Sequence, residues 1–473
     1  MKVDLRISGE IFEELRTHLY PGDGNEAVAV ALCGMQTSED CTTLLVHKLI
    51  KIPYEDCISR SPVKVQWRTG KLVESLEYAA KKQFAIVKFH SHPTGYLSFS
   101  ELDDSSDKEL FNSIFSWIDG VNFHGSVIML PDGKLFGRSI DSNLTFRPIR
   151  KVTIIGHDLK FFFSSPVEHL VQEFELRTAQ AFGPGTTSIV KQLTVGVVGC
   201  SGTGSPVIEQ LARLGFKKIV LVDPDKIEVK NLNRILNSKM SDAVDGRFKV
   251  DVLKEAIESM GLGTEVEPFP LNLYDLRVIK KIRSCDVLFG CMDTVDGRQL
   301  LNTISTFYLI PYFDLGVKLI ADGRGGIDQV WGTVHYLQPG KSSLMTRGVY
   351  THEDLAAASL YRQDPQQYRS LRSEGYIKNV VVESPAVISV NMQVASLALI
   401  EFLSRIHKFR YEDNSEGAIT RISLTDCYIQ RQPDTEVDMY LQKYSGRGDC
   451  SPMLNMPELT ENPINEHFAI SRD

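Results

Sequence analysis

The stretch LTVGVVGCSGTGSPVIEQLARLGFKKIVLVD, residues 193–223, decides the fold of the second half of the chain. An apolar run leads into a glycine-rich turn, a helix is expected over 205–215, and a second apolar run ends at Asp223. A strand, a glycine turn, a helix and a strand within about 30 residues form a βαβ unit of a parallel sheet. Apolar runs near 286–291 and 309–315 extend this pattern, so the sequence predicts a doubly covered α/β sheet.

The glycine-rich turn indicates a phosphate site. Gly199, Gly202 and Gly204 follow a predicted strand and open a predicted helix, so backbone amides and the helix dipole can receive phosphate there. Asp223 ends the second strand, where a carboxylate can bind ribose hydroxyls. Dehydrogenases, methyltransferases and nucleotidyl-transferring enzymes share this arrangement, so the turn alone does not distinguish them.

Polar residues beyond Asp223 favour a nucleoside triphosphate. Asn231 and Arg234 follow soon after it, and Lys249 adds another cation. Asp293 ends a later apolar run, where a carboxylate could hold Mg²⁺. Hydride transfer needs no cations clustered on a γ-phosphate, whereas attack on an α-phosphoryl group that expels pyrophosphate does. We therefore expect ATP and magnesium rather than a nicotinamide cofactor.

From about residue 171 to 410, the chain resembles the ThiF/MoeB-like adenylation domain of ubiquitin-activating (E1-like) enzymes. The resemblance implies a Rossmann-like fold, catalytic roles for Arg177 and Lys249, and magnesium at Asp293. It places Arg177 where the family has an arginine that reaches into the partner subunit's site, which implies a homodimer with composite active sites. The nucleotide-binding residues that it implies are Gly199, Gly202, Gly204, Asp223, Asn231, Arg234 and Lys249.

Two features depart from that family. Ser201 stands in the turn where the family has the second of two consecutive glycines. The stretch 292–426 contains no cysteine, so the family's paired Cys-x-x-Cys zinc ligands and its thioester-forming cysteine are both missing. Cys450, near the end of the chain, is the remaining candidate acceptor, with an ordinary thiol as the alternative. Acyl transfer through a cysteine of this chain is therefore not expected.

The first half of the chain carries a second group of polar residues, within HSHPTGYLSFSELD, residues 90–103. His90 and His92 are two apart at the end of a predicted strand, so both imidazoles point to one face. Ser100 can cap the next helix, and its first turn brings Asp103 back towards the histidines. Two imidazoles and one carboxylate leave the fourth position of a tetrahedral Zn²⁺ open for water, as in catalytic sites.

Glu26, at the start of an adjacent apolar strand, is a candidate base for such a site. Together with the histidines, the seven-residue spacer and Ser100-x-x-Asp103, it resembles the JAB/JAMM metalloprotease motif over most of the first 140 residues. The resemblance implies a cytidine-deaminase-like α/β sandwich, with His90, His92 and Asp103 as zinc ligands. It also implies that Glu26 is the general acid/base and that Ser100 donates to the developing oxyanion.

The length and composition limit the number of domains and the kinds of partner. A chain of 473 residues predicts two or three domains, and its net charge of −8 argues against nucleic acid as the partner. The first residues lack a signal-peptide pattern, and no apolar run reaches the roughly 20 residues that span a bilayer, so we expect a soluble, cytoplasmic protein. The predicted domain boundaries are 1–150 for the metalloprotease-like domain, 151–170 for a linker, 171–435 for the adenylation-like domain and 436–473 for a tail.

The two sites together predict a bifunctional enzyme. Its second half would adenylate the C-terminal glycine of a ubiquitin-like protein, and its first half would process or remove that modifier. The activated modifier would pass to a separate conjugating enzyme or, alternatively, to a sulfur-transfer partner in cofactor or amino-acid biosynthesis. A scaffold with one inactive domain is a further alternative, and a nicotinamide dehydrogenase would leave Asn231, Arg234, Lys249 and Asp293 unexplained.

Overall fold

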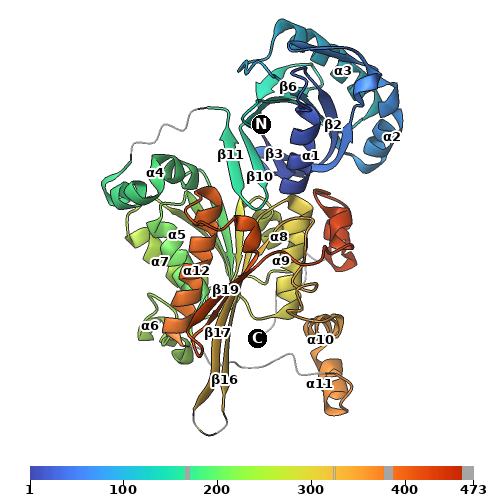
Figure 1. Cartoon of the computed structure of the whole chain (residues 1–473). Helices are drawn as coiled ribbons and strands as arrows, with labels where there is room; N and C mark the ends of the chain where they lie inside the picture. Colours follow the sequence, from blue (N-terminus) through green and yellow to red (C-terminus); the bar gives the residue numbers. More distant parts are fainter. Residues whose placement is uncertain (166–170, 323, 325, 378–386, 461–473) are drawn as a thin grey trace.

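The computed structural model describes residues 1–165, 171–322, 324, 326–377 and 387–460, and the strands within them form two large sheets and one small hairpin (Figure 1). One large sheet comes from the amino-terminal part of the chain and the other from the carboxyl-terminal part. Each sheet has an extensive buried apolar core. The predicted combination of two α/β units is therefore confirmed.

The first sheet has nine strands, and their spatial order is β11-β10-β1-β3-β2-β6-β7-β8-β9. In chain order these strands are β1 (Lys2–Ser8), β2 (Val28–Thr37), β3 (Cys41–Lys51), β6 (Ala85–Ser91), β7 (Phe123–Met129), β8 (Leu135–Asp141), β9 (Phe146–Pro148), β10 (Lys151–Ile155) and β11 (Leu159–Phe163). The same unit contains the helices α1 (Gly9–Leu19), α2 (Val73–Lys82) and α3 (Glu101–Trp117), the hairpin strands β4 (Cys57–Ser61) and β5 (Lys64–Trp67), and the 3-10 helices at Tyr54–Asp56 and Thr69–Leu72.

The structure extends the first unit beyond residue 150. Residues 151–163, which we expected within a linker, form β10 and β11, and β10 pairs in parallel with β1. Val152 and Ile154 point into the apolar core of the first unit, while Ile155 and Leu159 pack with the core of the second. These two short strands have apolar side chains on both faces because both faces are covered, so they lack the simple alternation of an exposed strand.

The second sheet has eight strands in the order β14-β13-β12-β15-β16-β17-β18-β19. The first five strands in this order pair in parallel, and each of β17, β18 and β19 pairs antiparallel with the strand before it. The strands are β12 (Thr194–Val198), β13 (Lys218–Val222), β14 (Glu265–Phe269), β15 (Val287–Gly290), β16 (Tyr312–Ala321), β17 (Ile327–Leu337), β18 (Ile419–Ser423) and β19 (Tyr428–Gln432). The helices are α4 (Leu176–Val190), α5 (Gly204–Arg213), α6 (Met240–Val244), α7 (Lys249–Ser259), α8 (Leu276–Ile282), α9 (Val295–Tyr308), α10 (His352–Gln363), α11 (Pro365–Ser373) and α12 (Ile388–Ile406).

The βαβ unit has the predicted form. β12, α5 and β13 follow one another, and β12 and β13 are neighbouring parallel strands. Gly199 ends β12 with φ of +90°, and a Cβ there would lie 2.6 Å from the carbonyl oxygen of Cys291. Only glycine tolerates both this backbone conformation and this close approach. The turn is therefore held at the carboxyl edge of the sheet, between β12 and β15.

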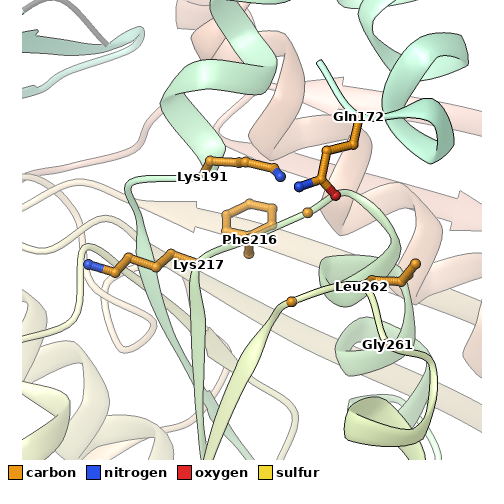
Figure 2. A pocket seen from close by; sticks show the side chains of 8 residues that line it. Gln172, Lys191, Phe216, Lys217, Gly261 and Leu262 are labelled. Atoms are coloured by element: carbon orange, nitrogen blue, oxygen red, sulfur yellow. The ribbon is translucent and has the colours of Figure 1, made fainter. Parts of the chain in front are cut away.

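The opposite, amino edge of the second sheet contains a cavity of ≈ 310 Å³. Its lining includes Phe216 and Lys217, just before β13, and Gly261 and Gly263, before β14. Figure 2 shows the side chains of Lys191 and Gln172 extending toward each other at this cavity. Because it lies at the amino ends of the strands, this cavity is separate from the glycine turn.

A buried carboxylate joins the two units at this amino edge. Asp286 immediately precedes β15, and its Oδ1 lies 2.5 Å from Lys151 Nζ and 3.7 Å from Arg6 Nη2, both of the first unit. The backbone N–H of Thr194 donates to its other oxygen at 3.1 Å. Burial alone would raise the pKa of Asp286, but Lys151 and Arg6 outweigh burial and lower it. The ion pairs therefore connect the first sheet directly to β12 and β15.

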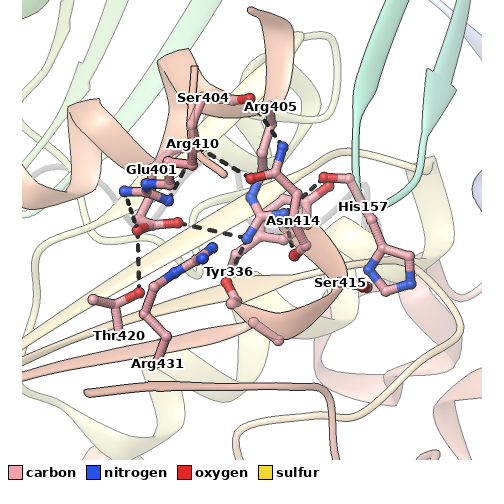
Figure 3. A network of polar contacts seen from close by, with 12 residues as sticks. His157, Tyr336, Glu401, Ser404, Arg405, Arg410, Asn414, Ser415, Thr420 and Arg431 are labelled. Carbon is pink, nitrogen blue, oxygen red and sulfur yellow. Dashed lines mark hydrogen bonds and ion pairs between the residues drawn. The ribbon is translucent and has the colours of Figure 1, made fainter. Parts of the chain in front are cut away.

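A polar network around Glu401 of α12 includes a hydrogen bond to the turn between β10 and β11 (Figure 3). The fully buried Glu401 lies 2.6 Å from Arg410 and accepts a hydrogen bond from Thr420 at 3.1 Å. Arg405, also buried, donates to the carbonyl of His157 at 2.7 Å. This network supplies a second attachment between the units.

Part of the predicted tail forms a third attachment. Asp449 pairs with Arg283, accepts from the Tyr308 hydroxyl at 3.0 Å and accepts from the Thr37 N–H at 3.2 Å. Its own N–H donates to the Met35 carbonyl at 2.7 Å. The segment around Asp449 therefore lies between the end of β2 and the helices α8 and α9. The tail also contains short 3-10 helices at Leu441–Tyr444, Met453–Asn455 and Pro457–Leu459. Residues 461–473 of that tail are outside the described part of the chain.

We predict that Asp286→Ala lowers the free energy of unfolding by about 3 kcal/mol, because it removes the nearest carboxylate of two buried cations, although Lys151 keeps Asp4 at 3.8 Å and Arg6 keeps two carbonyl acceptors. Urea unfolding at pH 7 measures this loss. Because the folded-state pKa of Asp286 is lowered, its stabilisation is present above the unfolded-state pKa of about 4 and is lost as pH falls through the folded-state pKa.

Asp132→Ala, at an exposed carboxylate of the first unit, is the matched control and should change stability by no more than about 0.5 kcal/mol. An Asp286→Ala protein as stable as this control would show that the buried ion pairs do not hold the units together.

Candidate functional site

The end of β6 and the first turn of α3 bring three candidate metal ligands together. Asp103 Oδ1 lies 3.1 Å from His90 Nε2, and Asp103 Oδ2 lies 3.7 Å from His92 Nε2. One donor atom from each of the three residues falls within 4.8 Å of the others. Two imidazole nitrogens and a carboxylate oxygen at this spacing are a donor set that suits Zn²⁺.

The surroundings shift the two histidines in opposite directions, because burial of His92 is outweighed by Asp103 and the Tyr96 carbonyl, which raise its pKa. His92 Nδ1 lies 2.8 Å from the Tyr96 carbonyl, so Nδ1 carries a proton and Nε2 is the nitrogen that a metal would take. Burial lowers the pKa of His90 to about 4. Neither ring nitrogen of His90 has a hydrogen-bond partner within the described chain, and both are buried. A metal at Nε2 would satisfy one of these orphaned atoms, so the residues present fit zinc.

Asp103 is held as a carboxylate. Burial would raise its pKa, but the nearby imidazoles of His90 and His92 and a hydrogen bond from the Ser100 backbone N–H lower it strongly. The Ser100 hydroxyl donates to Asp103 Oδ2 at 2.7 Å and accepts from the Asp103 N–H at 3.1 Å. Ser100 is therefore both the N-cap of α3 and a contact of the candidate ligand, and its hydroxyl proton is directed at Asp103 rather than at the predicted oxyanion position.

Glu26 precedes β2 and is only 6% exposed. Its backbone is fixed by the β4–β5 hairpin, because its N–H donates to the Ser61 carbonyl at 2.8 Å and its carbonyl accepts from Arg60 Nε at 2.9 Å. Burial raises the pKa of Glu26 to about 7, with His92 lowering it and Asp103 raising it. A carboxyl group with this pKa can both accept and release a proton near neutral pH.

A second group of predicted residues meets at the carboxyl edge of the second sheet. Asp223, 6% exposed, accepts from the N–H of Cys200 in the glycine turn at 2.7 Å. Lys249 Nζ lies 3.4 Å from Asp223 and 2.7 Å from Asp225. Burial raises the pKa of Asp223, although Lys249 opposes this shift. Asp225 was not among the predicted residues; its position two residues beyond Asp223 was the available signal.

Three other predicted residues surround this edge. Asn231 is buried, and its Oδ1 accepts from the Glu228 N–H at 3.0 Å, which shapes the 3-10 helix at Val229–Asn231. Arg234 reaches the glycine turn, since its Cδ is 3.1 Å from the position a Cβ would take on Gly202. Asp293 is exposed and follows β15 closely. Asn231 thus has a structural role already, and Arg234 Nη1 donates to the Lys230 carbonyl at 2.8 Å and to Asn233 at 3.1 Å, which leaves its other N–H groups and Asp293 for a ligand.

Arg177 is placed differently. It is exposed in the first turn of α4, where its guanidinium donates to Gln180 at 3.3 Å. No hydrogen bond or ion pair among the described residues joins it to the glycine turn. A role for Arg177 at a nucleotide site would therefore come from a second copy of the chain.

Comparison with known proteins finds a family match for each half of the chain. The model of the ThiF family matches residues 175–433, more than half of the chain, and the chain belongs to this family. A model described as prokaryotic homologs of the JAB domain matches residues 8–135, so the amino-terminal unit is JAB-like. These matches confirm the predicted combination of the two families. No described helix is both long and apolar enough to cross a membrane.

Individual relatives match only in part. "Ubiquitin-like modifier-activating enzyme 5" of Bombyx mori is 26% identical over 165 residues, which cover 33% of this chain and 39% of that protein. "Adenylyltransferase and sulfurtransferase MOCS3" of Danio rerio is 32% identical over 114 residues, 24% of each chain. A crystal structure of E. coli MccB with MccA-N7isoASN is 19% identical, with a TM-score of 0.44, over 57% of this chain and 74% of that one. The chain thus spans well under half the length of the two curated relatives.

We predict that Asp103→Ala and His92→Ala each weaken zinc binding by at least about 100-fold, because loss of a ligand exceeds the 10–100-fold cost of changing an outer contact. Zinc titration followed by calorimetry measures this, with His352→Ala, an exposed histidine on α10, as the control. Unchanged zinc affinity in both variants would show that these residues do not form the metal site.

Proposed function

We propose that the ThiF-family half transfers AMP from ATP to the C-terminal carboxylate of a ubiquitin-like or sulfur-carrier protein. A carboxylate oxygen attacks the α-phosphorus, the bond from that phosphorus to the bridging oxygen breaks, and pyrophosphate leaves. The observation that carries this proposal is the contact of the glycine turn with Asp223 and of Asp223 with Lys249. The activities named for the Bombyx mori and Danio rerio relatives support the same reaction class.

Each residue of the edge has a role in this proposal. Asp223 accepts hydrogen bonds from the ribose hydroxyls, as a carboxylate at the end of the second strand does in nucleotide-binding βαβ units. Lys249 and Arg234 balance the charge of the phosphates and of the departing pyrophosphate. Asp293 would hold Mg²⁺ against the same phosphates. Arg177 would complete the site of the partner subunit in a homodimer.

We further propose that the JAB-like half cleaves a peptide or isopeptide bond after the modifier's terminal glycine. Zn²⁺ would be held by His90, His92 and Asp103, and it would supply a water of lowered pKa and an acidic centre for the carbonyl. Glu26, whose pKa of about 7 suits it both to accept and to release a proton, would act as the general acid/base. The Ser100 hydroxyl, which donates to Asp103 Oδ2 in the free structure, would have to turn to the carbonyl oxygen to stabilise its charge.

The two sites face away from each other. His90 pairs with Val28 at the start of β2, whereas Thr37, which contacts the 445–449 segment, is at the far end, about 30 Å along the strand. Asp286 contacts the first unit from the amino edge of the second sheet, and the glycine turn lies at the carboxyl edge. Figure 1 shows α3 and β6 at the upper end and α6, which follows β13, at the lower end. A modifier would therefore leave one site before it reaches the other.

The acceptor of the activated modifier is proposed to be another protein, because residues 292–426 contain no cysteine. Cys450 is half-buried beside Asp449, and its thiol donates to the Pro452 carbonyl at 3.3 Å. Either a conjugating enzyme or a sulfur-transfer partner could receive the acyl group. The similarity to the enzyme named adenylyltransferase and sulfurtransferase is the observation that favours the second. We place these reactions in the cytoplasm.

We predict that the protein exchanges labelled pyrophosphate into ATP when given a glycine-terminated ubiquitin-like protein, and that Lys249→Ala lowers this rate about 100-fold by removing a fixed positive charge. Lys254→Ala, on the same helix, is the control and should leave the rate unchanged. Glu26→Gln should also leave exchange unchanged while abolishing cleavage of a modifier precursor. Exchange by Lys249→Ala at the wild-type rate would contradict the proposed adenylation site.

A further inference from the structure

Asn391 is a buried polar residue that the proposed mechanism does not use. It lies in the first turn of α12 and is 3% exposed. No hydrogen bond joins its side chain to another residue that the structure describes, although the amide atoms themselves are not fully enclosed. A polar side chain of a buried residue that has no partner in the protein is in a position to bind a ligand.

The amide of Asn391 points at the glycine turn. Its Nδ2 lies 2.4 Å from the position that a Cβ would take on Gly202, and the Cδ of Arg234 lies 3.1 Å from the same position. The absence of a side chain at Gly202 is therefore what allows the amide and the arginine to approach the turn from two directions. Both side chains are hydrogen-bond donors, and Arg234 is a cation.

The helices at this position are arranged to attract an anion. α5 and α12 pack side by side (Figure 1) and run in the same direction, because Gly202 meets Asn391 at their starts and the rings of Phe216 and Phe402 are 5.6 Å apart at their other ends. Neither helix has a side-chain cap at its N-terminus. Two uncapped, positive helix ends side by side repel each other unless a negative group lies between them.

We infer that Asn391 binds a phosphate group of the nucleotide, with its amide N–H groups donating to phosphate oxygens between the starts of α5 and α12. The inference rests on the proposed ATP site and adds to it a residue from a helix almost 200 positions further along the chain than the glycine turn. Phosphate rather than the nucleoside is the ligand because Asp223, at the neighbouring strand end, marks the ribose position.

The test compares ATP and adenosine binding by calorimetry in the full-length protein. Asn391→Leu removes the donors and Asn391→Asp replaces them with a negative charge at nearly the same volume. Each should weaken ATP binding at least about tenfold, because a hydrogen bond to a charged group is lost. Adenosine binding should stay within about twofold of wild type, as expected for a site away from the substitution.

Gln393→Glu is the matched control, since it adds the same charge to the first turns of α12 at an exposed position. It should bind ATP almost as the wild type does. ATP binding by Asn391→Asp at wild-type affinity would overturn the inference, and so would equal losses for ATP and adenosine, which indicate a general distortion. A wild-type protein that binds no ATP would overturn the proposed function itself and the inference with it.

Discussion

The ion pairs of Asp286 with Lys151 and Arg6 set the arrangement on which both sites depend. A fully buried carboxylate is stable only when its partners stay in place, so the first sheet is fixed against the amino ends of β12 and β15. The carboxyl ends of the same strands are then left free for the glycine turn. The candidate metal ligands, at the far end of β6, are likewise clear of the junction. Together with the Arg405 and Asp449 contacts, this buried carboxylate leaves the two candidate sites open at opposite ends of the molecule.

Within each site, backbone structure places the reactive groups. At the candidate metal ligands the cap of α3 is also the contact that orients Asp103, so forming the helix assembles the ligands. At the nucleotide edge, the turn that only Gly199 can make brings the N–H of Cys200 to Asp223. The chemistry at both places therefore follows from local folding rather than from long flexible side chains, which lose more entropy when they are positioned.

Much of this could be predicted from the sequence because the signals are local. Strand and helix periodicity over a few residues predicts the βαβ unit. The same periodicity predicts that His90 and His92 share one face of a strand and that the first turn of the next helix brings Asp103 beside them. Three features could not be predicted in this way. They are the strands at 151–163, the attachment of the two units at Asp449, and the position of Asn391 beside the glycine turn. Their partners lie far away in the chain, and neither composition nor spacing indicates which distant residues will meet. Arg177 remains a prediction, since its proposed partner is a second subunit.

The claim that the modifier leaves one site before it reaches the other is tested most directly in one reaction. The reaction contains a labelled modifier precursor, ATP and an excess of unlabelled mature modifier. If the product of cleavage must leave before it is adenylated, the labelled fraction of the adenylate will equal the labelled fraction of mature modifier in solution. An adenylate carrying much more label than the solution would show direct transfer between the sites and contradict the arrangement described above.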